Sequence, residues 1–305
     1  DTIIMIISIL FIFIVGFFFR AESADLSRIP VDERAQYQDQ NGLPYMYDMD
    51  SYYNYRLTSN FINHGYLGDT IVNGTEYDVY SSFPQGLPMN YPPLLIYLTA
   101  TIFYILNLFF EIPLIYVCYW LIACIAPITG VIAYLFVSRI NNKYGAFIAG
   151  LLTVVAPFYF FRTIPSWFDT DIFIILFSLL ILWVLYEATR TDKNYKIVLY
   201  SILAGIITAL FSLSWNGWAL IFYIIIFSFF VYFMCSIFLK LKITNSLKVF
   251  VVFVSVVLFL VFVLGVANLD SLLFPFNFVE SSSTSNWPNI YLSVAELRTP
   301  SIIDI

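Results

Sequence analysis

Long apolar runs dominate the chain, and short polar stretches separate them. Each run has about the length of a helix that crosses the ~30 Å hydrocarbon core of a bilayer, which takes ~20 residues. Such continuous apolarity is typical of spanning helices rather than of the amphipathic helices of soluble proteins. The pattern therefore predicts an all-α polytopic membrane protein. The eight runs cover residues 3–19, 92–110, 113–138, 145–161, 172–189, 197–213, 217–239 and 249–267.

Composition supports this class. Hydrophobic residues make up 61% of the 305 residues and charged residues only 11%, which lies outside the range of soluble domains. The net charge of −6 argues against a nucleic-acid partner, because such a partner favours a basic surface. Membrane lipids are the expected surroundings.

Basic residues indicate how the runs are oriented. All six lysines fall in three short loops, which the positive-inside rule places in the cytoplasm. Of the 20 acidic residues, only Asp1, Glu187 and Asp192 then lie on the cytoplasmic side. The lysines are Lys143, Lys193, Lys196, Lys240, Lys242 and Lys248.

This orientation requires that one of the eight runs does not cross the membrane. Run 92–110 is the best candidate, because Pro92-Pro93 and Pro113 bound it as a short helix. With that run on the outer leaflet, seven spans remain, and Asp50, Asp169 and Glu296 all face the exterior. If it crosses, Asp50 and Asp169 lie on opposite sides.

These external acids are the candidate chemistry. Asp169 and Asp171, two residues apart, can bind one hard divalent cation through oxygen, and Asp50 can supply a third carboxylate. The alternative is that Asp169 or Thr170 caps a helix whose first turn contains Asp171. Asp50 can equally be a solvated residue of an aromatic belt.

Two further features lie in predicted external loops. Glu296 follows the Ser/Thr stretch 281–285, so a mobile loop can bring its carboxylate to a substrate, although an ordinary loop glutamate is the alternative. Asn73-Gly74-Thr75 is an N-glycosylation acceptor sequence, which makes Asn73 a candidate modification site.

In their order and topology these motifs resemble the catalytic subunit of oligosaccharyltransferase, the STT3 family, and most closely its archaeal members. The resemblance extends over nearly the whole chain. The motifs that carry it are Asp48-Met49-Asp50-Ser51-Tyr52-Tyr53-Asn54-Tyr55-Arg56, Phe83-Pro84-Gln85-Gly86, Tyr91-Pro92-Pro93-Leu94, Trp167-Phe168-Asp169-Thr170-Asp171, Trp215-Asn216-Gly217-Trp218 and Ser293-Val294-Ala295-Glu296.

The resemblance implies a C-type glycosyltransferase (GT-C) transmembrane domain over residues 1–305. Residues 20–112 would form a first external loop with a membrane-parallel helix, and residues 268–305 an incomplete acceptor-binding loop. We expect the family's soluble C-terminal domain, with its Trp-Trp-Asp-Tyr-Gly motif, to be absent from this chain. The family also has more spans before the acceptor loop than the seven counted here.

The implied reaction moves an oligosaccharide from a dolichyl phosphate or pyrophosphate carrier to asparagine in Asn-X-Ser/Thr of an acceptor polypeptide, with inversion at the sugar. By motif position, Asp50, Asp169 and Asp171 would hold Mn²⁺ or Mg²⁺. Asp50 and Glu296 would hydrogen-bond the acceptor amide, and Trp215 and Arg56 are possible substrate contacts. The expected location is the archaeal cell membrane, with the active site on its external face.

Two other classes stay open. Another lipid-linked glycosyltransferase, such as a protein O-mannosyltransferase, also carries an acidic site after its first span. A transporter is the alternative outside enzymes, but transporter carboxylates usually lie near the midplane of the bilayer. Here the acids stand at the ends of the apolar runs.

Overall fold

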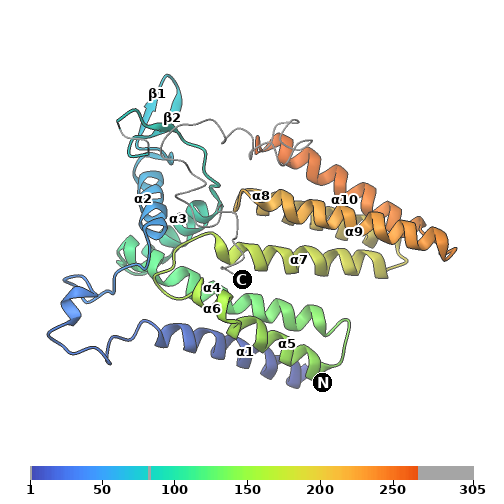
Figure 1. Cartoon of the computed structure of the whole chain (residues 1–305), viewed down its shortest axis with the longest axis horizontal. Coiled ribbons are helices and arrows are strands. Elements are labelled where there is room, and N and C mark those ends of the chain that lie inside the picture. Colours follow the sequence, from blue (N-terminus) through green and yellow to red (C-terminus); the bar gives the residue numbers. More distant parts are fainter. Residues whose placement is uncertain (1, 82–83, 267–305) are drawn as a thin grey trace, which may run out of the picture. The chain divides into compact units, whose positions relative to one another are not determined.

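The computed structural model describes residues 2–81 and 84–266, which are mostly helical (Figure 1). The chain divides after Leu260 into two units, and the first contains nearly all of the described residues. Among the described residues, six helices are long and apolar enough to cross a membrane, which confirms the multi-pass class. They are α1 (Thr2–Glu22), α4 (Leu114–Val137), α7 (Asp171–Arg190), α8 (Asn194–Ser212), α9 (Trp218–Phe238) and α10 (Thr244–Val263).

The prediction of one continuous helix over residues 145–161 is wrong, so only six of the seven predicted spans are single helices of spanning length among the described residues. Two helices replace that span, α5 (Lys143–Val155) and α6 (Pro157–Phe161). Pro157 has no backbone N–H and disfavours the helical region for Ala156, whose φ of −54° and ψ of 122° end α5. Helix α5 packs on both α4 and α1, so α5 and α6 together still bring the chain back along α4.

A fully buried arginine holds this break in place. Arg20, at the end of α1, donates from Nη1 to the carbonyl oxygens of Gly16 at 2.8 Å and Val154 at 3.1 Å. Its Nε and Nη2 donate to Thr163 Oγ1 at 3.0 and 2.7 Å. The Val154 carbonyl is one of those that a helix end leaves without an intrahelical donor. Arg20 therefore joins the end of α1 to the break, a role that the sequence analysis did not predict.

Helices α4 and α5 approach closely through glycine. A methyl group on Gly130 would lie 2.8 Å from the Gly150 carbonyl oxygen and would also meet the side chain of Val154. Small residues at such a contact allow membrane helices to pack backbone against backbone.

The lysine-bearing loops gather at one end of the helices, as the charge distribution predicts (Figure 1). Arg139, after α4, pairs with Glu187 near the end of α7, with Nη2 and Oε2 3.0 Å apart. Lys248 Nζ, early in α10, donates to Asn194 Oδ1 at the start of α8 at 3.0 Å. Which side of the membrane this end faces stays a prediction.

The opposite end carries the segment between α1 and α4. It contains a short 3₁₀ helix (Arg34–Gln36), α2 (Met49–His64) and α3 (Leu94–Asn107). It also forms an antiparallel sheet in the order β1-β2-β3, which was not predicted, from Thr70–Val72, Thr75–Asp78 and Leu87–Pro88.

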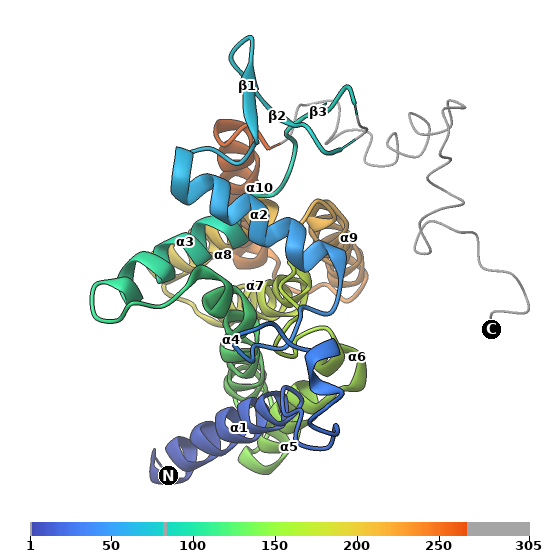
Figure 2. The ribbon, with the colours of Figure 1, turned by 90° about the vertical axis from the view of Figure 1, so that its left-hand side faces the viewer.

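Helices α2 and α3 pack on each other and lie across the ends of the long helices (Figure 2). The 14 residues of α3 extend about 21 Å, which is less than the hydrocarbon core. This length agrees with the predicted short helix that does not cross.

Candidate active site

The first turns of α2 hold the chain just before Asp169 through hydrogen bonds. Asp48 caps α2, and its Oδ1 accepts hydrogen bonds from the Ser51 N–H at 2.9 Å and the Ser51 hydroxyl at 2.6 Å. The Phe168 N–H donates to Ser51 Oγ at 2.9 Å, and Asn54 Nδ2 donates to the Phe168 carbonyl oxygen at 3.0 Å. Ser51 and Asn54 are fully buried. Both polar groups of the Phe168 backbone are thus held by one face of α2.

The loop before α7 is fixed from a second direction as well. Ser166 has a left-handed backbone with φ of 80°, which is uncommon for a residue other than glycine. Its N–H donates to the Tyr119 carbonyl oxygen in α4 at 3.1 Å, and its own carbonyl accepts from the Tyr47 N–H at 3.2 Å. The loop therefore places Asp169 beside the first turn of α2, which contains Asp50.

The pKa of Asp169 is strongly shifted. Burial raises its pKa to about 6, with further contributions from the negative charges of Asp171, Asp50 and Asp48. A hydrogen bond of 2.6 Å from the Thr170 N–H acts in the opposite direction. The charge of Asp50 thus acts on Asp169 in the folded chain. The predicted site, which contains both acids, requires this proximity.

Asp171 has a different setting. It is the first residue of α7, so it lies in the first turn as the helix-start alternative predicts, and Thr170 occupies the N-cap position without a capping hydrogen bond from its side chain. Asp171 Oδ2 accepts from Arg162 Nη1 at 2.9 Å. The Arg162 guanidinium lies 4.8 Å from the ring centre of Trp167. Arg162, which the sequence analysis did not single out, therefore neutralises one of the predicted metal ligands.

Within residues 2–81 and 84–266, no three His, Cys, Asp or Glu side chains converge closely enough to form a metal centre as they stand. The available donors are nevertheless hard carboxylate oxygens, which suit Mg²⁺ and Mn²⁺. Their mutual repulsion at Asp169 also fits a cation. Binding through Asp50, Asp169 and Asp171 stays a prediction.

Tyr91 also belongs to this site, although the sequence analysis noted it only as part of a motif. Burial holds the pKa of its phenol far above the usual range, and the charges of Asp169 and Asp50 add to this effect. The Tyr91 hydroxyl contacts the Asn54 amide group, and its ring centre lies 5.4 Å from that of Tyr53. A hydroxyl group thus stands among the acids.

Arg56, predicted as a possible substrate contact, has two anionic partners in the structure. Its Nη1 lies 2.8 Å from Asp69 Oδ2, and its Nη2 lies 2.9 Å from Asp78 Oδ1. Its guanidinium also lies 5.2 Å from the ring centre of Tyr53 and 4.9 Å from that of Tyr80. These contacts favour a role in joining α2 to the sheet.

The other candidate residues are more scattered. Trp215 follows α8 and stacks on Phe211, with ring centres 5.8 Å apart, and stays half-buried. Asn73 is exposed at the turn between β1 and β2, with φ of 52°, and its modification stays a prediction. Glu296 lies outside the described residues.

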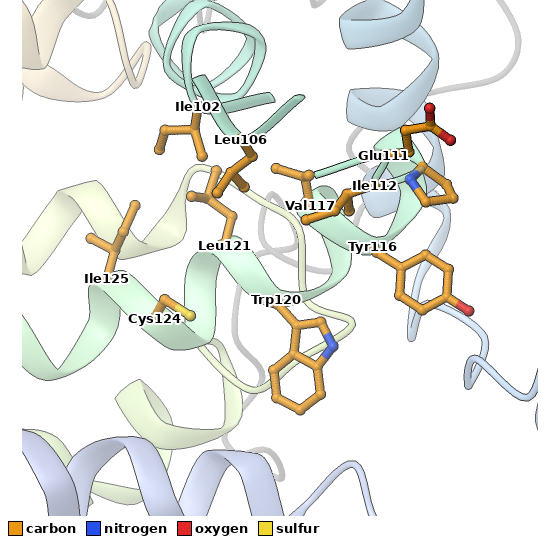
Figure 3. A pocket seen from close by; sticks show the side chains of 11 residues that line it. Ile102, Leu106, Glu111, Ile112, Tyr116, Val117, Trp120, Leu121, Cys124 and Ile125 are labelled. Atoms are coloured by element: carbon orange, nitrogen blue, oxygen red, sulfur yellow. The ribbon is translucent and has the colours of Figure 1, made fainter. Parts of the chain in front are cut away.

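An apolar groove lies between α3 and α4 (Figure 3). Its volume is about 640 Å³, and Leu106, Trp120 and Leu121 are among its lining residues. The predicted acids Asp50 and Asp169 do not line it. A surface of this kind suits hydrocarbon rather than phosphate or sugar, so the acids remain the candidate site.

Comparison with known proteins identifies the family. The family model described as "Oligosaccharyl transferase STT3, N-terminal" matches residues 4–305. The chain belongs to the STT3 oligosaccharyltransferase family. This membership confirms the resemblance read from the motifs, and favours it over the O-mannosyltransferase and transporter alternatives.

Two curated archaeal relatives are both named dolichyl-phosphooligosaccharide-protein glycotransferase. The one from Methanococcus voltae is 27% identical over 98% of this chain and 36% of its own length. The one from Methanocaldococcus jannaschii is 31% identical over 61% of this chain and 21% of its own length. The chain thus spans about a third of the length of the first of these relatives.

Solved structures of the Archaeoglobus fulgidus oligosaccharyltransferase share the fold. The complex with Zn and sulfate matches with a TM-score of 0.65 at 21% identity, over 82% of this chain and 30% of that one. The AglB complex with an inhibitory peptide and a dolichol-phosphate matches with a TM-score of 0.63 at 19% identity, over 83% and 29%. The GT-C fold is therefore confirmed.

Proposed function

We propose that this STT3-family chain forms the membrane-embedded part of an enzyme that transfers an oligosaccharide from a dolichyl phosphate or pyrophosphate carrier to asparagine in Asn-X-Ser/Thr. The observation that carries the proposal is the pair of hydrogen bonds that Ser51 and Asn54 make with the backbone of Phe168. These bonds hold Asp50 and Asp169, more than 100 residues apart in the sequence, near enough for their charges to interact.

The names of similar proteins support the substrates. Both curated relatives are named for transfer from a dolichyl phospho-oligosaccharide to protein. The Archaeoglobus fulgidus protein is described with a dolichol-phosphate, and in another structure it is tethered to an acceptor peptide with the NVT sequon. We extend these substrate classes to the present chain.

The reaction makes two demands on the site. The leaving phosphate carries negative charge, and a divalent cation bound there would act on it as a Lewis acid. We assign Asp50, Asp169 and Asp171 to hold Mn²⁺ or Mg²⁺, by their hard oxygens and by the accumulated negative charge at Asp169. For Asp171 this assignment requires that its carboxylate exchange or share the Arg162 ion pair.

The second demand concerns the acceptor amide, whose nitrogen is a poor nucleophile because its lone pair is delocalised into the carbonyl group. Asp50 and Glu296 are the residues that we assign to accept hydrogen bonds from its N–H groups. Asp50 is exposed in the first turn of α2, where an extended peptide has access to it. We further propose Trp215 as a substrate contact, on its motif position and partial exposure.

We propose that the acids face the exterior of the archaeal cell membrane. The support is that the starts of α2 and α7, which contain Asp50 and Asp171, lie at the end of the helices opposite to the lysine-bearing loops (Figure 1). Positive charge favours the cytoplasmic side, so the acids would face outward. A lipid-linked sugar and a secreted polypeptide would meet there.

The function is tested in membranes that contain the full-length protein, Mn²⁺, a lipid-linked oligosaccharide and an Asn-X-Thr peptide. Asp169→Asn and Glu296→Gln are each expected to lower glycopeptide formation about 100-fold or more. Asp192→Asn, at the exposed α7–α8 loop, is the matched control and should leave the rate unchanged. Normal glycopeptide formation by both Asp169→Asn and Glu296→Gln would refute the proposed site.

A further inference from the structure

The side-chain oxygen of Asn54 is buried and lacks a hydrogen-bond partner among the described residues. Asn54 is fully buried, and no hydrogen-bond donor in the described part of the chain reaches its Oδ1. A buried acceptor without a partner is unfavourable, because it has lost its hydrogen bonds to water and gained none in return. Such an atom requires a partner from outside the protein, which is either water or a bound cation.

The orientation of this amide is fixed by its neighbour. Asn54 Nδ2 donates to the carbonyl oxygen of Phe168 at 3.0 Å, and a carbonyl oxygen can only accept. Exchanging the nitrogen and oxygen positions would place two acceptors against each other. The free atom is therefore the oxygen, and it is a potential ligand for a cation.

Asn54 is linked to both acids, to Asp50 by its place on α2 and to Asp169 through a hydrogen bond. Residues i and i+4 lie on the same face of a helix, so Asn54 follows Asp50 one turn later on α2. Its hydrogen bond reaches the residue directly before Asp169. Tyr91, whose hydroxyl contacts the Asn54 amide, is acted on by the charges of both Asp169 and Asp50.

We infer that Asn54 Oδ1 is a further, neutral oxygen ligand of the divalent cation, beside the carboxylates of Asp50 and Asp169. This inference rests on the proposed function, which assigns a cation to these acids. Amide oxygens are ordinary ligands of hard cations. A neutral ligand is also suited to a place where Asp171 is already paired with Arg162 and where further negative charge would add repulsion.

A second buried polar atom without a partner belongs to a residue near Asp169 in the sequence. Trp167 Nε1, two residues before Asp169, has no acceptor in the described residues. An indole N–H only donates and cannot bind a cation. The ligand assignment is therefore specific to Asn54.

The test measures Mn²⁺ affinity directly, by electron paramagnetic resonance of free Mn²⁺ over the full-length protein in detergent. Asn54→Ala removes the oxygen and is expected to raise the Kd for Mn²⁺ about tenfold or more. Asn54→Asp keeps an oxygen at the same place and should bind at least as tightly as the parent. Asn63→Ala, an exposed asparagine on the same helix, is the control and should not change the Kd.

The paired variants separate ligation from positioning. Neither Ala nor an ionised Asp can donate to the Phe168 carbonyl, so equal weakening in both would mean that Asn54 acts only through that hydrogen bond, and would overturn the inference. If Asn54→Ala does not fold, Asn54→Leu keeps the volume, and the same loss of affinity is expected. Thermal unfolding without metal establishes that each variant is folded.

Two results distinguish the inference from the proposed function. Unchanged Mn²⁺ affinity in Asn54→Ala, together with lost affinity in Asp169→Ala, would overturn the role of Asn54 and leave the acidic site standing. Unchanged affinity in both Asp50→Ala and Asp169→Ala would overturn the cation site itself.

Discussion

Replacing Arg56 by methionine tests how the sheet is attached to α2. The guanidinium bridges Asp69 and Asp78, whose side chains are 14% and 3% exposed, while that of Arg56 is 25% exposed. The methionine side chain has a similar length and keeps contact with the rings of Tyr53 and Tyr80. The variant therefore removes the charge and leaves two poorly solvated carboxylates without it.

Removing one partner of a fully buried ion pair destabilises by about 3–5 kcal/mol. Because Arg56 is a quarter exposed, water replaces part of the interaction, and we expect about 2–4 kcal/mol. Every 1.4 kcal/mol corresponds to a factor of ten, so local opening of this region should become roughly 30- to 700-fold more frequent.

Hydrogen exchange measures this opening without requiring global unfolding. The segment to follow is residues 66–81, where the Val79 N–H donates to Asp69 Oδ2 at 3.1 Å and the Ser81 N–H donates to Asp78 Oδ1 at 3.1 Å. Arg139→Met is the matched control, because its pair with Glu187 is exposed and worth about 0–1 kcal/mol. Protection of residues 66–81 that is the same in Arg56→Met and the parent would refute the reasoning.

Three further predictions concern packing and pH. Arg20→Met should lower the stability to thermal unfolding in detergent by about 2–4 kcal/mol, because the buried Val154 carbonyl loses a donor. Gly130→Ala should destabilise by about 1–3 kcal/mol in the same assay, since its methyl group would lie 2.8 Å from the Gly150 carbonyl oxygen. Burial raises the pKa of Asp78, but hydrogen bonds from Ser81 and Arg56 hold this pKa well below the usual 3.8. The ionised Asp78 therefore contributes its full stabilisation above pH 3.8, and this contribution is lost as the pH falls further. Protection of residues 66–81 should fall below pH 3.8 in the parent, and a flat profile would contradict this assignment.

Much of the architecture follows from the order of apolar and polar residues. Apolar length alone predicts helices, because a backbone in hydrocarbon must satisfy its hydrogen bonds within the segment. The confinement of all lysines to three loops indicated which loops lie together, and the prolines around run 92–110 indicated a short helix. In each case the signal is local, so neighbouring residues suffice to detect it.

Run 145–161 shows where the apolar pattern fails as a signal. The run is continuously apolar and therefore predicts one helix, but Pro157 lacks a backbone N–H and restricts Ala156. The helix therefore ends at Val155. The stabilisation of that break by Arg20 joins residues 134 positions apart, and a pattern along the chain does not reveal it.

The candidate site divides in the same way. The sequence by itself determined the class of fold, the family motifs and the acids Asp50, Asp169 and Asp171, because residue type and order carry those signals. Only the tertiary structure decided that Ser51 and Asn54 hold Phe168, that Arg162 pairs with Asp171 and that Tyr91 stands among the acids. These relations depend on which faces of distant segments meet, and that is settled by packing and by the need to pair buried polar groups.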